Sequence, residues 1–274
     1  MSGSPTGVAR LIRRFGFALT LGLLVVAASI AATQPAGAVR NNEFKLLVTK
    51  IDAATVLKTL GLERQRADSE IVYYFDTSDK ILQAHHVILR ARQPEGRSGD
   101  STVKLRALAG TLELSNTERE LLPEQDWTDE RQPSEARSLS RKHIKKGLVD
   151  SVGSGAAPVA ELFTDTQRQL VEARVPGVAW DGLQAFGPVS AEVWSRQAQL
   201  AGFATPVTVE LWHLQQQGRS SEILEVSAKV RAKTDAEAQS LARQFFAASK
   251  AAGLGEPNGQ TKTQLVMDFF STLR

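Results

Sequence analysis

Cations recur at a spacing of two residues along two short segments, and this spacing is the first sign of chemistry in the chain. The segment VILRAR places Arg90 and Arg92 on one face of a strand and apolar residues on the other. The segment TVKLRAL does the same with Lys104 and Arg106. Guanidinium groups bind oxyanions through two parallel hydrogen bonds, and ammonium groups add point charges. Together these four side chains predict a surface that binds an anion such as phosphate.

Carboxylates share the charged faces of three other segments. Glu43 and Lys45 share one face of residues 43–49, and Glu210 lies on the charged face of residues 207–214. Glu225 and Lys229 share the charged face of residues 223–231. Carboxylates hold divalent cations, which bridge to phosphate oxygens. If the sheet curls so that these faces lie inside, the interior becomes a phosphate-binding channel.

The alternative is an ordinary antiparallel sheet with one face in water. Any single strand of this kind is explained well by that arrangement, because such sheets alternate between apolar and polar residues by default. The side chains here are almost all Arg, Lys or Glu, with few Thr, Ser or Gln to dilute them. Like charges on neighbouring strands repel unless an anion lies between them. The choice of residues therefore favours an enclosed anion site.

The elements that must position these residues are short strands with a few helices. Residues 52–60 predict a helix that Asp52 caps. Residues 235–252 predict the longest helix, with Thr234 or Asp235 as its cap and with Leu241, Phe245 and Phe246 on one face. Strands are predicted at residues 43–49, 71–75, 87–92, 102–108, 118–122, 191–194, 207–214, 223–231 and 265–270. Together these strands and helices predict an α+β domain of about eight antiparallel strands in a curved sheet or closed barrel, with flanking helices.

The middle of the chain has a weaker pattern. Residues 124–156 are polar and predict either a long excursion or a flexible loop with a short helix, and residues 159–173 predict a helix. The basic run 141–146 is typical of a solvated loop, with the alternative that it folds over the mouth of the channel and adds cations.

Several segments together resemble the CYTH superfamily, also called triphosphate tunnel metalloenzymes. The segments are NNEFKLLV, YYFDTSDKILQAHHVILRAR, TVKLRAL, VELWHL, ILEVSAKV and TKTQLVMDFF. That group includes class IV adenylate cyclases, thiamine triphosphatases and inorganic tripolyphosphatases. The resemblance covers most of residues 41–108 and 207–270, while residues 124–200 have no clear counterpart. It implies an eight-stranded antiparallel tunnel with helices outside, which binds and cleaves a triphosphate with Mg²⁺ or Mn²⁺.

The resemblance also assigns roles to particular residues. It implies that phosphate is bound by Lys45, Arg90, Arg92, Lys104, Arg106 and Lys262. Lys229, on the charged face of residues 223–231, is a further candidate phosphate ligand. The resemblance implies metal binding by Glu43 and Glu225, with Glu210 as a further carboxylate. Asn41 and Ser227 replace two glutamates of the family pattern. The sequence therefore keeps the cations of the pattern but has fewer of its carboxylates.

The loss of these two carboxylates leaves three hypotheses for the function. The first is a metal-dependent phosphohydrolase, because Mg²⁺ tolerates one or two carboxylates completed by water and substrate oxygens. The second is a protein that binds a polyanion without cleaving it, because hydrolysis with two metal ions needs more carboxylates. The third is a scaffold whose tunnel has lost its ligand.

The first 38 residues predict an export signal rather than part of the fold. Arg10, Arg13 and Arg14 precede an uncharged apolar run, residues 15–32, and the small residues 36–38 supply a cleavage site near Ala38. The run is close to the minimum length for a membrane helix, so an uncleaved anchor is the alternative. Residues 39–274 are then a tunnel domain that is secreted or periplasmic, with no membrane insertion after cleavage. The pair Arg13 and Arg14 leaves both common export routes open.

Removal of this signal makes the chain electrically neutral. The sequence has 33 basic and 30 acidic residues, and the three arginines of the signal account for the whole excess. Neutrality gives no support for binding to nucleic acid, so the predicted partner is a small phosphate ligand at a local cluster of cations. The sequence contains no cysteine, which excludes disulfides, thiol nucleophiles and thiolate metal sites.

Overall fold

A computed structural model describes residues 40–107, 113–119 and 121–271 of the chain. The chain divides into two compact units, 1–36 and 37–274, and all described residues belong to the second. The predicted export signal, residues 1–38, therefore lies outside the described residues and stays a prediction.

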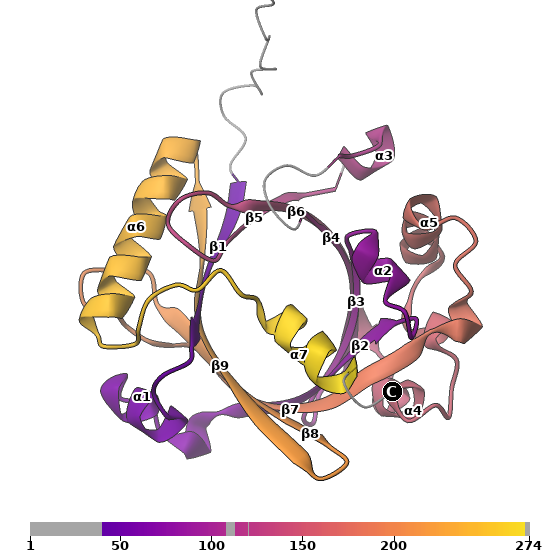
Figure 1. The fold of residues 1–274 in the computed structure, drawn as a ribbon, viewed down its shortest axis with the longest axis horizontal. Helices are drawn as coiled ribbons and strands as arrows, with labels where there is room; N and C mark the ends of the chain where they lie inside the picture. The colour runs from indigo at the N-terminus through magenta and orange to yellow at the C-terminus, as the bar shows by residue number, and fades with distance from the viewer. Residues whose placement is uncertain (1–39, 108–112, 120, 272–274) are drawn as a thin grey trace, which may run out of the picture. The chain divides into compact units, whose positions relative to one another are not determined.

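The strands of this unit form a closed barrel (Figure 1). Around the barrel the strands follow the order β1, β5, β6, β4, β3, β2, β7, β8 and β9, and β9 pairs with β1 to close it. The strands are β1 (Arg40–Val48), β2 (Asp68–Asp76), β3 (Val87–Pro94), β4 (Gly99–Arg106), β5 (Pro123–Trp127), β6 (Ser134–Ile144), β7 (Gln184–Ala198), β8 (Val207–Gln216) and β9 (Arg219–Ala232). This confirms the prediction of an α+β barrel of about eight strands. Nine strands are present, and the pair β1 and β5 is parallel.

The apolar faces of these strands point outward, where helices cover them. The helices are α1 (Ala53–Thr59), α2 (Ile81–Ala84), α3 (Asn116–Arg119), α4 (Leu148–Gly153), α5 (Asp165–Arg174), α6 (Asp235–Ala251) and α7 (Lys262–Ser271), with short 3-10 turns η1 (Arg64–Arg66), η2 (Val159–Leu162) and η3 (Trp180–Gly182). No helix in the described part of the chain is long and apolar enough to cross a membrane.

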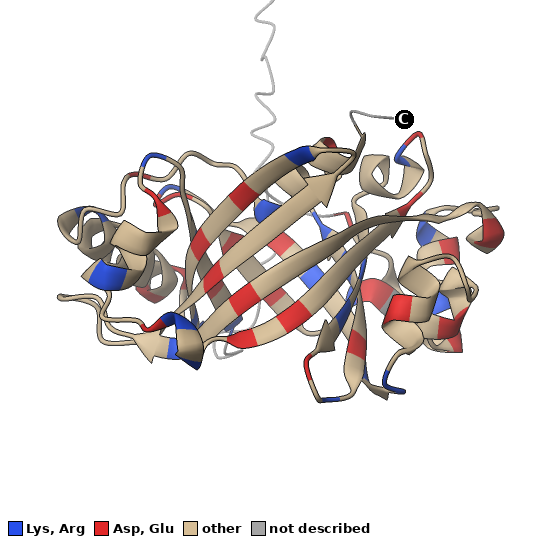
Figure 2. Ribbon diagram, turned by 90° about the horizontal axis from the view of Figure 1, so that it is seen from below, with Lys and Arg blue, Asp and Glu red and all other residues tan. Residues whose placement is uncertain are grey.

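Two hydrophobic clusters hold helices against the outside of the barrel. In one, Phe245 and Phe246 of α6 pack against Phe44 and Val226 of the strands. In the other, Leu89 and Val103 of the strands pack against the residues of α4, η2 and α5. Because the outer faces are apolar, the alternation of the strands sends their charged side chains inward. Figure 2 shows acidic and basic positions recurring along the barrel strands.

Both helices predicted with caps are confirmed. The side chain of Asp52 accepts a hydrogen bond from the backbone nitrogen of Thr55 at 2.9 Å and begins α1. The side chain of Thr234 accepts one from the backbone nitrogen of Glu237 and begins α6. These caps satisfy amide groups that have no partner within the helix.

The prediction of a last strand at residues 265–270 was wrong, because this segment is the helix α7. Its buried residues are Val266, Met267 and Phe270, at a spacing that fits a helix face rather than a strand. They pack against barrel residues that include Leu47 and Trp212, and Figure 1 shows α7 lying within the ring of strands. An apolar helix thus occupies part of the interior that the charged residues do not use.

Three further predictions were wrong, wholly or in part, in the middle of the chain. No strand is assigned to the described residues of 118–122, where one was predicted, and 118 and 119 belong to the short helix α3. The segment 124–156, predicted as an excursion or loop, contains most of β5, all of β6 and the helix α4. Residues 159–173 form η2 and most of α5 in place of one continuous helix. Polar strands were missed here because their inner faces are charged.

Candidate functional site

The charged faces of the strands enclose a polar cavity inside the barrel. Its volume is about 280 Å³, many times the space that one water molecule needs, so side chains do not fill the barrel here. All ten residues with a predicted role at the site line this cavity: Glu43, Lys45, Arg90, Arg92, Lys104, Arg106, Glu210, Glu225, Lys229 and Lys262. The alternative of a charged face open to water is therefore wrong for these strands, while the roles of the ten as ligands stay predictions.

Strands β3 and β4 supply four cations that are staggered. Their register pairs Arg90 with Thr102 and Lys104 with Ile88, so no two of these cations are direct cross-strand partners. Cations placed directly opposite each other would repel. The stagger lets four cations share one wall of the cavity.

Arg92 is held by carboxylates at one side of this wall. Its Nη2 lies 2.7 Å from Oδ2 of the buried Asp100, and its Nη1 lies 3.5 Å from Glu70. Burial raises the pKa of Asp100, but Arg92 outweighs it and leaves that pKa below its usual value. Lys142, from the basic run 141–146, lies 3.5 Å from the same carboxylate and also lines the cavity. Lys142 lies in strand β6, so the run 141–146 begins in the barrel and is not the loop that either prediction described, although one of its cations lines the cavity.

Arg90 differs from its neighbour because it has no carboxylate partner. No Asp or Glu oxygen in the described ranges lies within 4.0 Å of its guanidinium, although Arg90 faces the same cavity. Its Nε is buried and donates to no acceptor among the described residues. A buried donor without a partner carries a free-energy cost, and an anion in the cavity would remove it.

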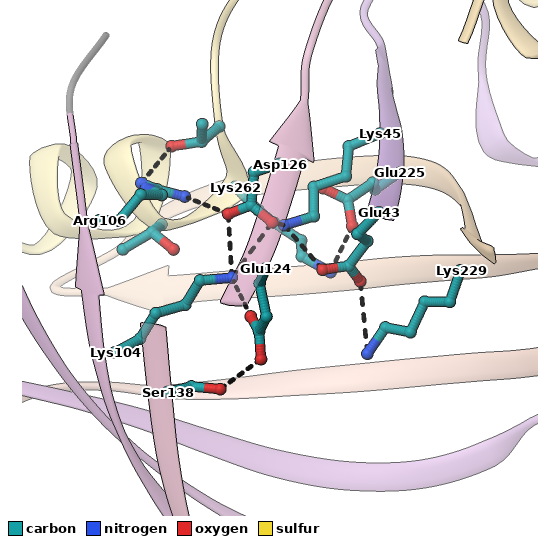
Figure 3. Close-up of polar contacts among 12 residues, drawn as sticks. Glu43, Lys45, Lys104, Arg106, Glu124, Asp126, Ser138, Glu225, Lys229 and Lys262 are labelled. Carbon is teal, nitrogen blue, oxygen red and sulfur yellow. Dashed lines mark hydrogen bonds and ion pairs between the residues drawn. The ribbon is translucent and has the colours of Figure 1, made fainter. Parts of the chain in front are cut away.

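Asp126 on β5 is the centre of the largest charge cluster (Figure 3). Its oxygens lie 3.0 Å from Lys45, 2.9 Å from Lys104 and 3.8 Å from Arg106, and its side chain is 2 % exposed. Burial raises the pKa of Asp126, but the charges of Lys45 and Lys104 outweigh burial and lower this pKa to about 2. A single carboxylate on β5 thus lies among three cations from two other strands, β1 and β4.

Glu43 lies beside this cluster on β1. Its carboxylate is 2.9 Å from Lys45 and 3.5 Å from Lys229, and Figure 3 shows it pointing toward both. Burial raises the pKa of Glu43, yet the two ammonium groups outweigh it and hold that pKa well below its usual range. Glu43 is therefore a charged carboxylate that lysines already engage.

Glu210 and Glu225 face each other across β8 and β9 with one ammonium between them. Lys262, the first residue of α7, lies 2.5 Å from Glu210 and 2.9 Å from Glu225. Nε1 of Trp212 donates to Glu210 at 2.9 Å, and the Lys262 ammonium lies 4.4 Å from the centre of the Trp212 ring.

The two carboxylates respond differently to the ammonium that they share. The pKa of Glu225 is raised, because burial of its 3 % exposed side chain outweighs Lys262. Burial also raises the pKa of Glu210, but Lys262 and Trp212 together lower it below its usual value. Burial opposes the charged form of Lys262, yet the two carboxylates raise its pKa above the ordinary value. Lys262 is therefore a charged ammonium.

Sequence reasoning missed four charged residues that line or support the cavity. They are Glu70, Asp100, Glu124 and Asp126. Glu124 and Asp126 alternate with Gln125 and Trp127, so the period of two in PEQDW was a signal for β5. Pairing of β5 with β1, which brings Asp126 beside Glu43, could not be read from that period.

The predicted metal ligands do not offer a vacant metal site in this arrangement. Glu43, Glu210 and Glu225 each lie within 3.0 Å of a lysine ammonium. Across the described residues, no group of three His, Cys, Asp or Glu side chains is arranged to hold a metal ion. Carboxylate oxygens are suitable ligands for Mg²⁺ or Mn²⁺, but here a cation would have to displace an ammonium first.

Comparisons with known proteins identify the fold. No protein-family model matches the sequence, and no curated protein matches it. A candidate adenylate cyclase from Bacillus halodurans has a similar structure, with a TM-score of 0.51, 14% identity, and coverage of 81% of this chain and 95% of the other. A candidate adenylyl cyclase from Hippeastrum, with a dominant triphosphatase activity, has a TM-score of 0.51, 16% identity, and coverage of 83% and 95%. The barrel therefore has the CYTH-type triphosphate tunnel fold, as the resemblance of the sequence predicted.

Proposed function

We propose that this chain, whose barrel has the triphosphate tunnel fold, binds a short linear phosphate chain such as tripolyphosphate inside the barrel. The observation that supports the proposal best is Arg90. Its guanidinium faces the cavity, its Nε is buried, and no described residue pairs with it. An oxyanion in the cavity would supply the missing acceptor.

The balance of charge in the cavity also supports an anionic ligand. Eight lysines and arginines line the cavity against five glutamates, and the buried Asp100 and Asp126 offset part of this excess. Alternate residues of a strand are about 7 Å apart, so an extended ligand can contact several cations of β3 and β4 at once. A linear phosphate chain meets both conditions, because its charges are spread along one axis.

A binding experiment tests this proposal. The purified protein is heated with and without tripolyphosphate, and the affinity is then measured by calorimetry. A ligand at about 100 times its Kd stabilises a protein by about 2.7 kcal/mol, which raises the melting temperature measurably. Sodium chloride at equal ionic strength is the control for salt effects. Absence of any shift at millimolar tripolyphosphate would leave the cavity without its proposed ligand.

Hydrolysis of the bound triphosphate is the second candidate function. The triphosphatase activity of the Hippeastrum protein with this fold favours it. The resemblance of the sequence implies Mg²⁺ or Mn²⁺ as the cofactor of that reaction, whereas lysines engage the three predicted metal ligands. Phosphate release from tripolyphosphate, measured with each metal and with none, separates hydrolysis from binding alone. A scaffold with an unused tunnel would show neither binding nor release.

A further inference from the structure

We infer that the ammonium of Lys262 takes the place of a divalent cation between Glu210 and Glu225, so that the cavity binds its phosphate ligand without a protein-bound metal. The inference rests on the proposed function, because it concerns how the same cavity receives phosphate. It departs from the metal-dependent chemistry that the resemblance of the sequence implies.

The position of Lys262 between the two carboxylates is the first argument. Glu210 and Glu225 are direct cross-strand partners, and the Nζ of Lys262 lies 2.5 Å from one and 2.9 Å from the other. Two facing carboxylates repel unless a cation lies between them. The ammonium satisfies that requirement, so the pair has no need of Mg²⁺ or Mn²⁺.

The second argument is that Lys262 is fixed by the helix that carries it. Lys262 begins α7, and Val266 and Phe270 of that helix are almost fully buried against the barrel. The Lys262 side chain is 13 % exposed, and its ammonium lies 4.4 Å from the ring centre of Trp212. Displacing the ammonium would require an incoming metal ion to break two ion pairs and a cation–π contact.

A third argument comes from the cost that a metal would have to overcome. Mg²⁺ demands an almost octahedral set of oxygens at about 2.0–2.1 Å and gives up its water reluctantly. The described residues supply two carboxylates at this position, and an ammonium already neutralises them. A soluble metal ion therefore gains little by entering the free protein here.

The first test measures ligand binding in the absence of metal. Tripolyphosphate is titrated into the purified protein in EDTA, and again in EDTA-free buffer with Mn²⁺. We expect binding in EDTA. Binding that occurs only with Mn²⁺ would overturn the inference while leaving the proposed function intact. Absence of binding in both buffers would refute the proposed function itself, and the inference with it.

The second test converts the position into a metal site. Lys262→Met keeps an unbranched side chain that is one heavy atom shorter and removes its charge, which leaves Glu210 and Glu225 facing each other. Mn²⁺ binding to the protein without phosphate is measured by electron paramagnetic resonance. We expect no bound Mn²⁺ in the wild type, about one ion per chain in the variant, and loss of that ion in Lys262→Met combined with Glu210→Gln.

A matched control separates the charge of Lys262 from the docking of α7. Lys80→Met removes an ammonium that pairs with Asp268 on the same helix but does not line the cavity. This variant is expected to bind no Mn²⁺. Equal Mn²⁺ binding by the wild type and by Lys262→Met would contradict the inference. If Lys262→Met does not fold, the titration of the wild type in EDTA still tests whether tripolyphosphate binds without a metal.

Discussion

At the scale of single residues, Arg90 and Arg92 show how one strand face holds two different kinds of cation. Arg92 is bound to Asp100 and Glu70 before any ligand arrives, whereas Arg90 has no ion pair in the described chain. Their types and spacing are the same, so the difference comes from the strands that lie beside them. We therefore expect their substitutions to have different effects.

Arg90→Ala is predicted to weaken tripolyphosphate binding without lowering stability. A hydrogen bond to a charged group contributes about 1.5–3 kcal/mol, which corresponds to roughly ten- to a hundredfold in Kd. Stability should not fall, because the free protein loses no ion pair. Calorimetry and thermal melting check both parts. Arg66→Ala, which removes an exposed ion pair with Glu63, is the control and should change neither. An unchanged Kd for Arg90→Ala would contradict the assignment.

The depressed pKa of Asp126 predicts a dependence of stability on pH. Its pKa is about 2 in the folded chain against an ordinary 3.8. Stability from a depressed carboxyl pKa is present above the unfolded value and is lost as the pH falls through the folded value. The contribution is about 2 kcal/mol, and it should disappear between about pH 4 and pH 2.

Asp126→Asn provides the measurement of that contribution. The free energy of unfolding is compared between wild type and variant across the acid range. The difference between them should shrink by about 2 kcal/mol as the pH falls from 5 to 2, because the wild type alone has this carboxylate to protonate. A constant difference over that range would show that Asp126 is not held ionised by its lysines.

At the scale of elements, α7 both closes part of the barrel interior and presents Lys262 to the cavity. Its apolar residues pack against strands that lie far away in sequence, while its first residue reaches Glu210 and Glu225. Packing of this one helix therefore couples the stability of the barrel to the charge arrangement of the site.

Phe270→Ala is predicted to lower stability by about 3–5 kcal/mol, because it removes a buried aromatic side chain. It should also weaken tripolyphosphate binding, since Lys262 loses its support. Phe269→Ala is the matched control, because Phe269 is only half-buried and lies under the Arg219 guanidinium. Chemical denaturation gives the free energy of unfolding of each variant. An equal loss of stability in the two variants would argue against burial of α7 through Phe270.

At the scale of the whole molecule, charge is balanced overall and concentrated inside the barrel. The chain from residue 39 onward carries 30 basic and 30 acidic residues, and eight of its cations line the cavity. Under the proposed function, we expect such a molecule to bind a small anion in its interior and to have no general affinity for polyanions such as nucleic acid. Charged side chains can line the interior because the apolar outer faces of the strands are covered by helices.

Export of the protein is proposed from its first 38 residues, and processing tests it. Expression in a bacterial host that exports proteins should yield a soluble chain beginning near Val39, as determined by N-terminal sequencing and intact mass. Arg13 and Arg14 replaced by Gln should reduce this processing, because the positive region precedes the apolar run. A full-length chain in the membrane fraction would instead support the uncleaved anchor.

The sequence by itself determined which residues share a face. Strand side chains alternate with a period of two, so spacing alone placed Arg90 with Arg92, and Lys104 with Arg106, on one face of each strand. Helix caps at Asp52 and Thr234 were equally predictable, because a cap is a contact between near neighbours in the chain. Each of these features depends on local backbone geometry.

Only the tertiary structure decided which charges meet. The parallel pairing of β5 with β1 brings Asp126 to Lys45, and the docking of α7 brings Lys262 to Glu210 and Glu225. The strand predicted for the end of the chain became a helix because its apolar residues could be buried inside the barrel. Contacts between residues 52 and 81 positions apart depend on how the whole barrel closes, and no local pattern specifies that closure.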